Sequence, residues 1–120
     1  MKGLIVEDNV VSAAVFEETL ANNDIDAVAV NEARSGLDVL RDAQGEIDAI
    51  LVDLMMPDMD GFQFIREVRK NQAWRDIPVG MCSAATEETL KTSALLGVEL
   101  YLLKPPTEAD LVATLREAVG

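Results

Sequence analysis

Short apolar runs alternate with amphipathic segments along the whole chain. Five runs have the length and composition of strands: 3–8, 25–30, 48–53, 78–81 and 98–103. Each is followed by apolar side chains at three- and four-residue spacing, which is typical of helices that bury one face. The apolar positions of these helices are Ala13, Phe16, Leu20, Leu37, Leu40, Phe62, Ile65, Val68, Leu90, Ala94, Leu95, Leu111, Leu115 and Ala118. The alternation predicts an α/β fold of the (βα)5 type, a parallel sheet with helices on both faces and right-handed crossovers.

Capping residues predict where several helices begin and end. Ser35, Asp60, Thr86 and Thr107 each stand at the expected start of a helix, where a side-chain oxygen can accept a backbone N–H. Gly97 is expected to end the fourth helix, because glycine readily adopts the left-handed conformation found there.

Size and composition narrow the possible functions. The length of 120 residues suits one domain, 1–120, and no apolar run is long enough to span a membrane. No signal peptide is expected, and the single cysteine, Cys82, suits a reducing cytoplasm. The formal net charge of −12 argues against direct binding to nucleic acid.

The chain contains no histidine. A Ser-His-Asp triad, a Cys-His pair and a histidine-ligated metal are therefore excluded. If phosphohistidine chemistry is involved, the histidine must come from another molecule.

Polar and charged side chains gather where the predicted strands end. Asp53 ends the central strand, Glu7 and Asp8 end the first, and Ser83 and Lys104 follow the fourth and fifth. The carboxyl ends of parallel strands lie on one edge of the sheet, where ligands bind in open α/β folds. Carboxylates crowded to ~4 Å repel by about 4 kcal/mol per pair at an effective dielectric of ~20, and a divalent cation would relieve that repulsion.

This set of side chains predicts a hard-cation site and a nucleophile. Asp8 and Asp53 can hold the cation, and Glu7 can ligate it directly or through a water. Met55 can add its backbone carbonyl, because its sulfur is a poor ligand for a hard cation. Oxygen ligands of this kind suit Mg²⁺, with Mn²⁺ as an alternative. The cation and Lys104 would neutralise an incoming phosphoryl group and leave Asp53 as the nucleophile.

The chain resembles the receiver domain of two-component response regulators over Lys2 to Val119. The resemblance is carried by the strand-end residues Glu7, Asp8, Asp53, Ser83 and Lys104, by the MPDMDG run after Asp53, and by the pair Lys104-Pro105. It implies a doubly wound, flavodoxin-like sheet with strand order 2-1-3-4-5. It further implies a cis Lys104–Pro105 bond, with Asp53 as phosphoacceptor, Lys104 and Ser83 as its catalytic partners, and Ser83 and Tyr101 as switch residues.

The same resemblance implies a signalling domain that catalyses only its own phosphorylation and slow dephosphorylation. The phosphoryl donor would be a sensor histidine kinase or a histidine phosphotransfer protein. Phosphorylation at Asp53 would draw Ser83 toward the new oxygens and let Tyr101 turn inward. The surface of the fourth helix, fifth strand and fifth helix would then bind an output partner or a second copy of the chain.

Two departures from the family pattern bear on the chemistry. Glu7 stands where Asp is commoner, which changes the outer geometry of the cation site. Met55 and Ala85, two residues past Asp53 and Ser83, lack polar groups that could position an attacking water. We therefore expect the phosphoryl group to persist for minutes or longer.

Three alternatives remain open on the sequence. A phosphatase of the haloacid dehalogenase type would need a second Asp at Met55. A calcium loop from Met56 to Glu67 would use Asp58, Asp60, Gly61 and Glu67 at loop positions 3, 5, 6 and 12, but Met56 is a poor first ligand. The fold could also serve only as a phosphorylation-independent protein-interaction module.

Overall fold

The computed structural model of the chain describes residues 1–43, 45–54, 58–83, 91–92, 94–98, 100–104 and 106–119. Its strands are β1 (Lys2–Val6), β2 (Asp26–Val30), β3 (Ala49–Asp53), β4 (Val79–Ser83) and β5 (Leu100–Leu103). Its helices are α1 (Val10–Ala21), α2 (Ala33–Ala43), α3 (Gly61–Lys70) and α5 (Glu108–Val119). The strand boundaries agree with the predicted ones to within two residues.

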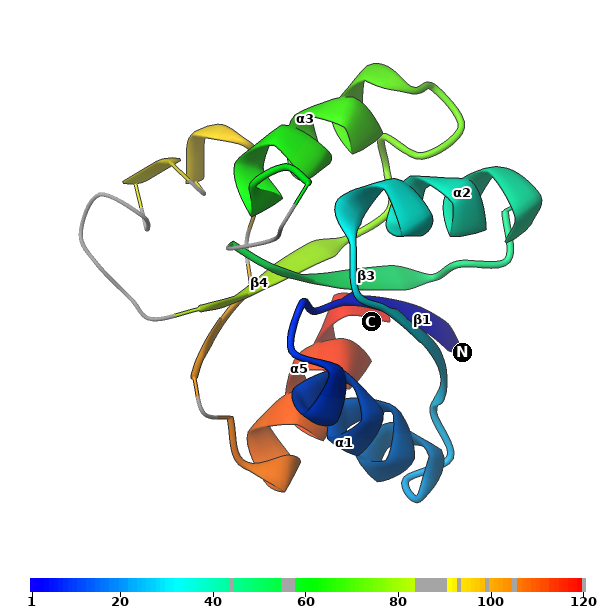
Figure 1. The fold of residues 1–120 in the computed structure, drawn as a ribbon, viewed down its shortest axis with the longest axis vertical. Coiled ribbons are helices and arrows are strands. Elements are labelled where there is room, and N and C mark those ends of the chain that lie inside the picture. Colours follow the sequence, from blue (N-terminus) through cyan, green and yellow to red (C-terminus); the bar gives the residue numbers. More distant parts are fainter. Residues whose placement is uncertain are drawn as a thin grey trace.

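The five strands form one parallel sheet in the order β2-β1-β3-β4-β5. Helices α2 and α3 lie on one face of this sheet, and α1 and α5 lie on the other (Figure 1). The predicted doubly wound α/β fold and its strand order are therefore confirmed, although the described residues contain four of the five expected helices. Among these residues no helix has the length and hydropathy required to cross a bilayer.

Successive residues of the central strands point alternately into two separate hydrophobic cores, one on each face of the sheet. Leu4, Val6, Ile50 and Val52 pack in the cluster that holds Leu37, Leu40, Phe64 and Ile65 of α2 and α3. Ile5 and Leu51 pack in the cluster that holds Phe16, Leu20, Leu111 and Leu115 of α1 and α5. Because side chains alternate across a strand, a strand covered on both faces must be apolar throughout. Each fully buried side chain of this size stabilises the folded state by about 1.5–3 kcal/mol. This burial fixes the central strands, and with them the positions of the strand ends.

The segment between β4 and β5 is described only in part. Residues 84–90, which include Thr86 and Leu90, lie outside the described residues, whereas 91–92 and 94–95 are helical. Gly97 follows with a φ of 76°, as expected of a residue that ends a helix. The inward placement of Ala94 and Leu95 is wrong: both are exposed, Leu95 by 87%, because Leu96 packs against the core instead.

Two of the predicted N-terminal helix caps, Asp60 and Thr107, are confirmed, and the predicted cap at Ser35 is wrong. The side chain of Asp60 accepts the N–H of Gln63, and Thr107 accepts that of Asp110. Ser35, however, lies inside α2, which begins two residues earlier. The N–H groups at that start are bound by the carboxylate of Asp58, which comes from a different loop and could not be found from local spacing.

Candidate functional site

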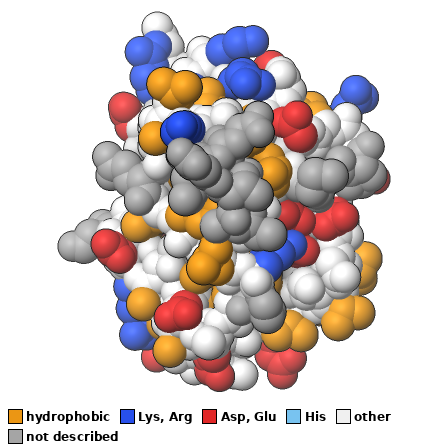
Figure 2. Space-filling view, turned by 90° about the vertical axis from the view of Figure 1, so that its left-hand side faces the viewer, with side chains coloured by type: hydrophobic (Ala, Val, Ile, Leu, Met, Phe, Trp, Pro, Cys, Tyr) orange, Lys and Arg blue, Asp and Glu red, His pale blue; other side chains and the backbone are white. Residues whose placement is uncertain are grey.

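The carboxyl ends of four strands meet at one edge of the sheet. Asp53 is the last residue of β3 and lies in register with Cys82 of β4, one residue before Ser83. Glu7 and Lys104 directly follow β1 and β5. Figure 2 looks onto this edge and shows acidic side chains next to a basic one in its right-hand half. The topology therefore brings the predicted strand-end residues to a common surface.

Three carboxylates form a compact acidic cluster. One oxygen from each of Glu7, Asp8 and Asp53 lies within 4.8 Å of the others. Glu7 and Asp53 are buried, being 1% and 4% exposed, while Asp8 faces solvent. Carboxylate oxygens at this spacing, with one side open to water, fit the preference of Mg²⁺ for oxygen ligands and retained waters. The residues present therefore suit a small divalent cation.

Lys104 supplies the positive charge within this cluster. Its Nζ lies 2.9 Å from both carboxylate oxygens of Glu7 and 3.0 Å from Oδ2 of Asp53. Burial lowers the pKa of Lys104, but the hydrogen bonds to Glu7 and Asp53 more than offset this, so the pKa lies above its usual 10.5. The ammonium is therefore charged at neutral pH and touches both buried acids at once.

The cluster also changes the acidity of its members. Burial raises the pKa of Glu7, the hydrogen bonds to Lys104 lower it, and the charge of Asp53 raises it again, leaving it above 4.5. Burial and the adjacent Asp53 raise the pKa of Asp8 above 3.8. Crowded carboxylates hold protons more tightly because each charge disfavours the next. A cation bound among them would displace those protons.

Ser83 and Tyr101 lie side by side next to this cluster. Ser83 is 7% exposed, and its carbonyl accepts the backbone N–H of Lys104 at 3.3 Å. Burial raises the pKa of the half-buried Tyr101, and a hydrogen bond to the Ser83 side chain partly offsets that rise. The two residues named as switch positions are therefore neighbours, with the Ser83 side chain close enough to Tyr101 to affect its pKa.

The loop after Asp53 is held against the strand that precedes it. The N–H of Gly61 donates to the carbonyl of Leu54 at 2.6 Å, and a Cβ on Gly61 would come 2.5 Å from the carbonyl oxygen of Asp53. Only glycine allows so close an approach between two backbones. The predicted carbonyl ligand Met55 lies outside the described residues.

Two other predictions also fall on residues that are not described. Ala85 was expected to leave the attacking water without a polar partner, and Pro105 was expected to follow a cis bond. Both therefore stay predictions.

The calcium-loop alternative is not supported by the described residues. Asp58 and Asp60 accept backbone N–H groups at the starts of α2 and α3, so they act as helix caps. Helix α3 already begins at Gly61, whereas a calcium loop would continue to Glu67. Among these residues the one group of three acids with metal-ligand spacing is the cluster of Glu7, Asp8 and Asp53.

Sequence reasoning missed two residues that support this edge. The carboxylate of Asp58 binds the N–H groups of Ala33 and Arg34, and Asn31 Nδ2 donates to the carbonyl of Glu7 at 3.0 Å. Asp58 was considered as a calcium ligand and as part of the MPDMDG run, and Asn31 carried no signal at all. Its contact joins residues 24 positions apart, which no local pattern reports.

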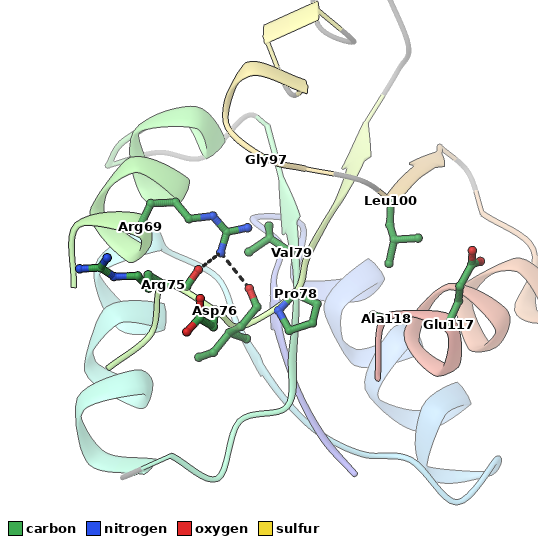
Figure 3. Close-up of a pocket in the computed structure, with 10 residues that line it drawn as sticks. Arg69, Arg75, Asp76, Pro78, Val79, Gly97, Leu100, Glu117 and Ala118 are labelled. Carbon is green, nitrogen blue, oxygen red and sulfur yellow. Dashed lines mark hydrogen bonds between the residues drawn. The ribbon is translucent and has the colours of Figure 1, made fainter. Parts of the chain in front are cut away.

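A cavity of about 630 Å³ lies at the opposite ends of β4 and β5 (Figure 3). One of the charged groups that line it is the guanidinium of Arg69, which donates to the carbonyls of Arg75 and Ile77 at 2.8 and 2.9 Å. Arg69 thereby ties the end of α3 to the start of β4. Because those donors are engaged by backbone and the acidic cluster is at the other edge, this cavity is not assigned to the chemistry.

Comparisons with known proteins agree with this geometry. Residues 4–116 match the family model described as response regulator receiver domain. The KDP operon transcriptional regulatory protein KdpE of Escherichia coli (strain K12) is 36% identical, over 97% of this chain and 50% of KdpE. The sensor histidine kinase CheAY of Helicobacter pylori is 30% identical, over 97% of this chain and 15% of CheAY. The chain thus spans half or less of the length of these relatives.

Solved structures show the same architecture. The chemotaxis response regulator CheY4 of Vibrio cholerae superposes with a TM-score of 0.89 at 26% identity, covering 98% of this chain and 97% of that one. A sensor protein from Polaromonas sp. JS666 superposes equally well, with a TM-score of 0.89, at 30% identity. The match of family model, fold and strand-end residues leads to one conclusion: the chain belongs to the response regulator receiver domains of two-component signal transduction.

Proposed function

We propose that this chain accepts a phosphoryl group on Asp53 from a phosphohistidine of a partner protein and passes the signal on through a changed surface. The observation that carries the proposal is the position of Asp53, whose carboxylate lies within 4.8 Å of carboxylate oxygens of two further acids and 3.0 Å from the ammonium of Lys104. A sensor histidine kinase or a histidine phosphotransfer protein would be the donor. The chain itself has no histidine and therefore cannot supply one.

The transfer step uses Asp53 as nucleophile. A carboxylate oxygen forms a bond to phosphorus while the phosphorus–nitrogen bond to the donor histidine breaks, and the electron pair leaves on the imidazole nitrogen. Lys104, 3.0 Å from Oδ2 of Asp53, can pair with a phosphoryl oxygen and offset the added charge. Mg²⁺ or Mn²⁺ held by Glu7, Asp8, Asp53 and the carbonyl of Met55 would supply further neutralisation of the phosphoryl oxygens.

The donor protein must reach Asp53 across the surface that borders it. Val11 and Val15 of α1 are 72% and 51% exposed, and they line a groove of about 460 Å³ that also includes Lys104 and Pro106. Exposed valines of this kind can bury against the apolar face of a helical partner, which would bring its phosphohistidine to the acidic cluster.

The signal would leave the site through Ser83 and Tyr101. Because the Ser83 side chain lies close enough to Tyr101 to affect its pKa, a turn of Ser83 toward a phosphoryl oxygen would change the surroundings of Tyr101. The result is a shift between two packings of the surface that includes β5 and α5, together with the preceding helical segment. That surface would bind an output partner or a second copy of the chain.

Incubation with Mg²⁺ and a small phosphodonor, followed by mass spectrometry, tests the proposal. We expect one phosphoryl group, located on Asp53 and lost in Asp53→Asn. Asp48→Asn is the matched control, because it removes the same charge at the opposite end of β3 and should leave the reaction intact. Modification at another residue would contradict the assignment. No modification of the wild type by a small donor or a phosphohistidine protein would favour a phosphorylation-independent interaction module.

A further inference from the structure

We propose that Asn31 and Asp58 are positioning residues that keep the two halves of the acidic cluster at the separation a divalent cation requires. One half is Glu7 with Asp8 after β1, and the other is Asp53 at the end of β3. The inference deepens the proposed function, because it concerns the same cation site. Neither positioning residue belongs to the cluster, so both must act through the backbone that carries it.

Sheet pairing alone does not set the spacing between the two halves. The register of β1 with β3 ends at the pair Val6 and Val52, just before Glu7 and Asp53. Asp53 is still held in the sheet by its pairing with Cys82 of β4, whereas Glu7 and Asp8 lie beyond the end of β1. The distance between the two halves therefore also depends on what the loop that carries Glu7 and Asp8 contacts.

The segment 31–34, which runs from the end of β2 into the first turn of α2, contacts both the loop that carries Glu7 and Asp8 and the loop after Asp53. On one side Asn31 Nδ2 donates to the carbonyl of Glu7 at 3.0 Å. On the other side the N–H groups of Ala33 and Arg34 donate to the two carboxylate oxygens of Asp58 at 3.0 and 2.9 Å. Hydrogen bonds at the two ends of segment 31–34 thus link the loop that carries Glu7 and Asp8 to Asp58, which follows β3 in the chain.

The Asp58 end of this path is firmly held. Burial raises the pKa of Asp58, but the N–H groups of Arg34 and Ala33 outweigh it and leave the pKa below 3.8. The Asp58 side chain, 16% exposed, sits at the positive N-terminus of α2, where a carboxylate is stabilised.

Helix α2, which receives the Asp58 carboxylate, is packed closely against the sheet. A Cβ on Gly36 of α2 would already lie 3.1 Å from side-chain atoms of Val6 and Phe64, so α2 is packed tightly on the sheet. Asp58 is therefore tied to a fixed support.

The test compares Mg²⁺ affinity, measured by calorimetry on folded protein, with the free energy of unfolding. Loss of a residue that orients metal ligands typically weakens binding by about 10- to 100-fold, and we expect about 10-fold for Asn31→Ala and for Asp58→Ala. Asn31→Ala changes no charge, so its effect cannot be attributed to weaker long-range attraction. Asp58→Asn keeps one acceptor oxygen and should fall between the wild type and Asp58→Ala.

Asp48→Asn serves as the control for charge and for a lost N–H contact. Its carboxylate accepts the N–H of Lys2 at 2.8 Å at the other edge of the sheet, and its loss should change affinity by less than about 2-fold. If both residues act through one path, the loss in the double variant Asn31→Ala/Asp58→Ala should be smaller than the product of the two single losses.

The outcomes separate this inference from the function on which it rests. Lower stability with unchanged Mg²⁺ affinity in both alanine variants would overturn the positioning role, and so would multiplicative losses in the double variant. A wild-type chain that binds no Mg²⁺ would instead overturn the proposed cation site itself.

Discussion

Replacing Lys104 with methionine removes the ammonium and keeps most of the apolar stem. The change leaves Glu7 and Asp53, whose side chains are 2% and 5% exposed, without their shared positive partner. Removing one member of a buried ion pair costs about 3–5 kcal/mol, because the remaining charge is uncompensated. Lys104 is itself 30% exposed, so water replaces part of the lost interaction, and we expect a loss of about 2–3 kcal/mol at about pH 8 without Mg²⁺.

The loss should shrink as the pH falls. The pKa of Glu7 is already above 4.5 in the folded chain, and removing Lys104 raises it further. A carboxyl whose pKa is raised by folding stabilises the fold below its unfolded pKa, and this contribution is lost as pH rises through the folded value. As the pH falls through the raised pKa of Glu7, the carboxyl takes up a proton and the repulsion is relieved, so the variant should approach the wild type.

Urea unfolding followed by the fluorescence of Trp74, the single tryptophan and 9% exposed, measures this loss. Lys2→Met is the matched control, because Lys2 pairs with the exposed Glu46 at 3.7 Å and such surface pairs contribute about 0–1 kcal/mol. The double variant Glu7→Gln/Lys104→Met should recover most of the stability. Equal losses for Lys2→Met and Lys104→Met, or a loss that does not vary with pH, would refute the reasoning.

Three further predictions follow from the same edge of the sheet. Because the pKa values of Glu7 and Asp8 are raised, Mg²⁺ affinity should fall from about pH 7 to about pH 5 with release of protons on binding, and calorimetry showing constant affinity would contradict this. Gly61→Ala should cost about 1–3 kcal/mol and slow phosphorylation, since the new Cβ meets the β3 backbone. Gly45→Ala strains a backbone with a φ of 86° but places its Cβ in open space, so it should lower stability and leave phosphorylation unchanged. Burial raises the pKa of Cys82 to about 12, so a thiol reagent should react at about pH 8 only on unfolding; equally fast reaction with native and unfolded protein would count against it.

The amino-acid sequence by itself determined the fold class and the composition of the acidic edge. Runs such as that of β3 are apolar throughout because both faces of a central parallel strand are covered. Asp53 and Glu7 were identified because each ends such a run, and the carboxyl ends of parallel strands must share an edge. These are local patterns of two- and four-residue spacing, which one sequence is sufficient to display.

Tertiary structure alone decided which groups are bonded to one another at that edge. Lys104 meets Glu7 across 97 positions, and Asp58, not Ser35, supports the start of α2 across 25. Contacts of this kind depend on how strands and helices pack, and burial makes them specific because a polar group taken from water needs a partner. The spacing of residues along the chain does not indicate which group that partner is. The hydrogen bonds and ion pairs around Asp53 could therefore be known only from the folded structure.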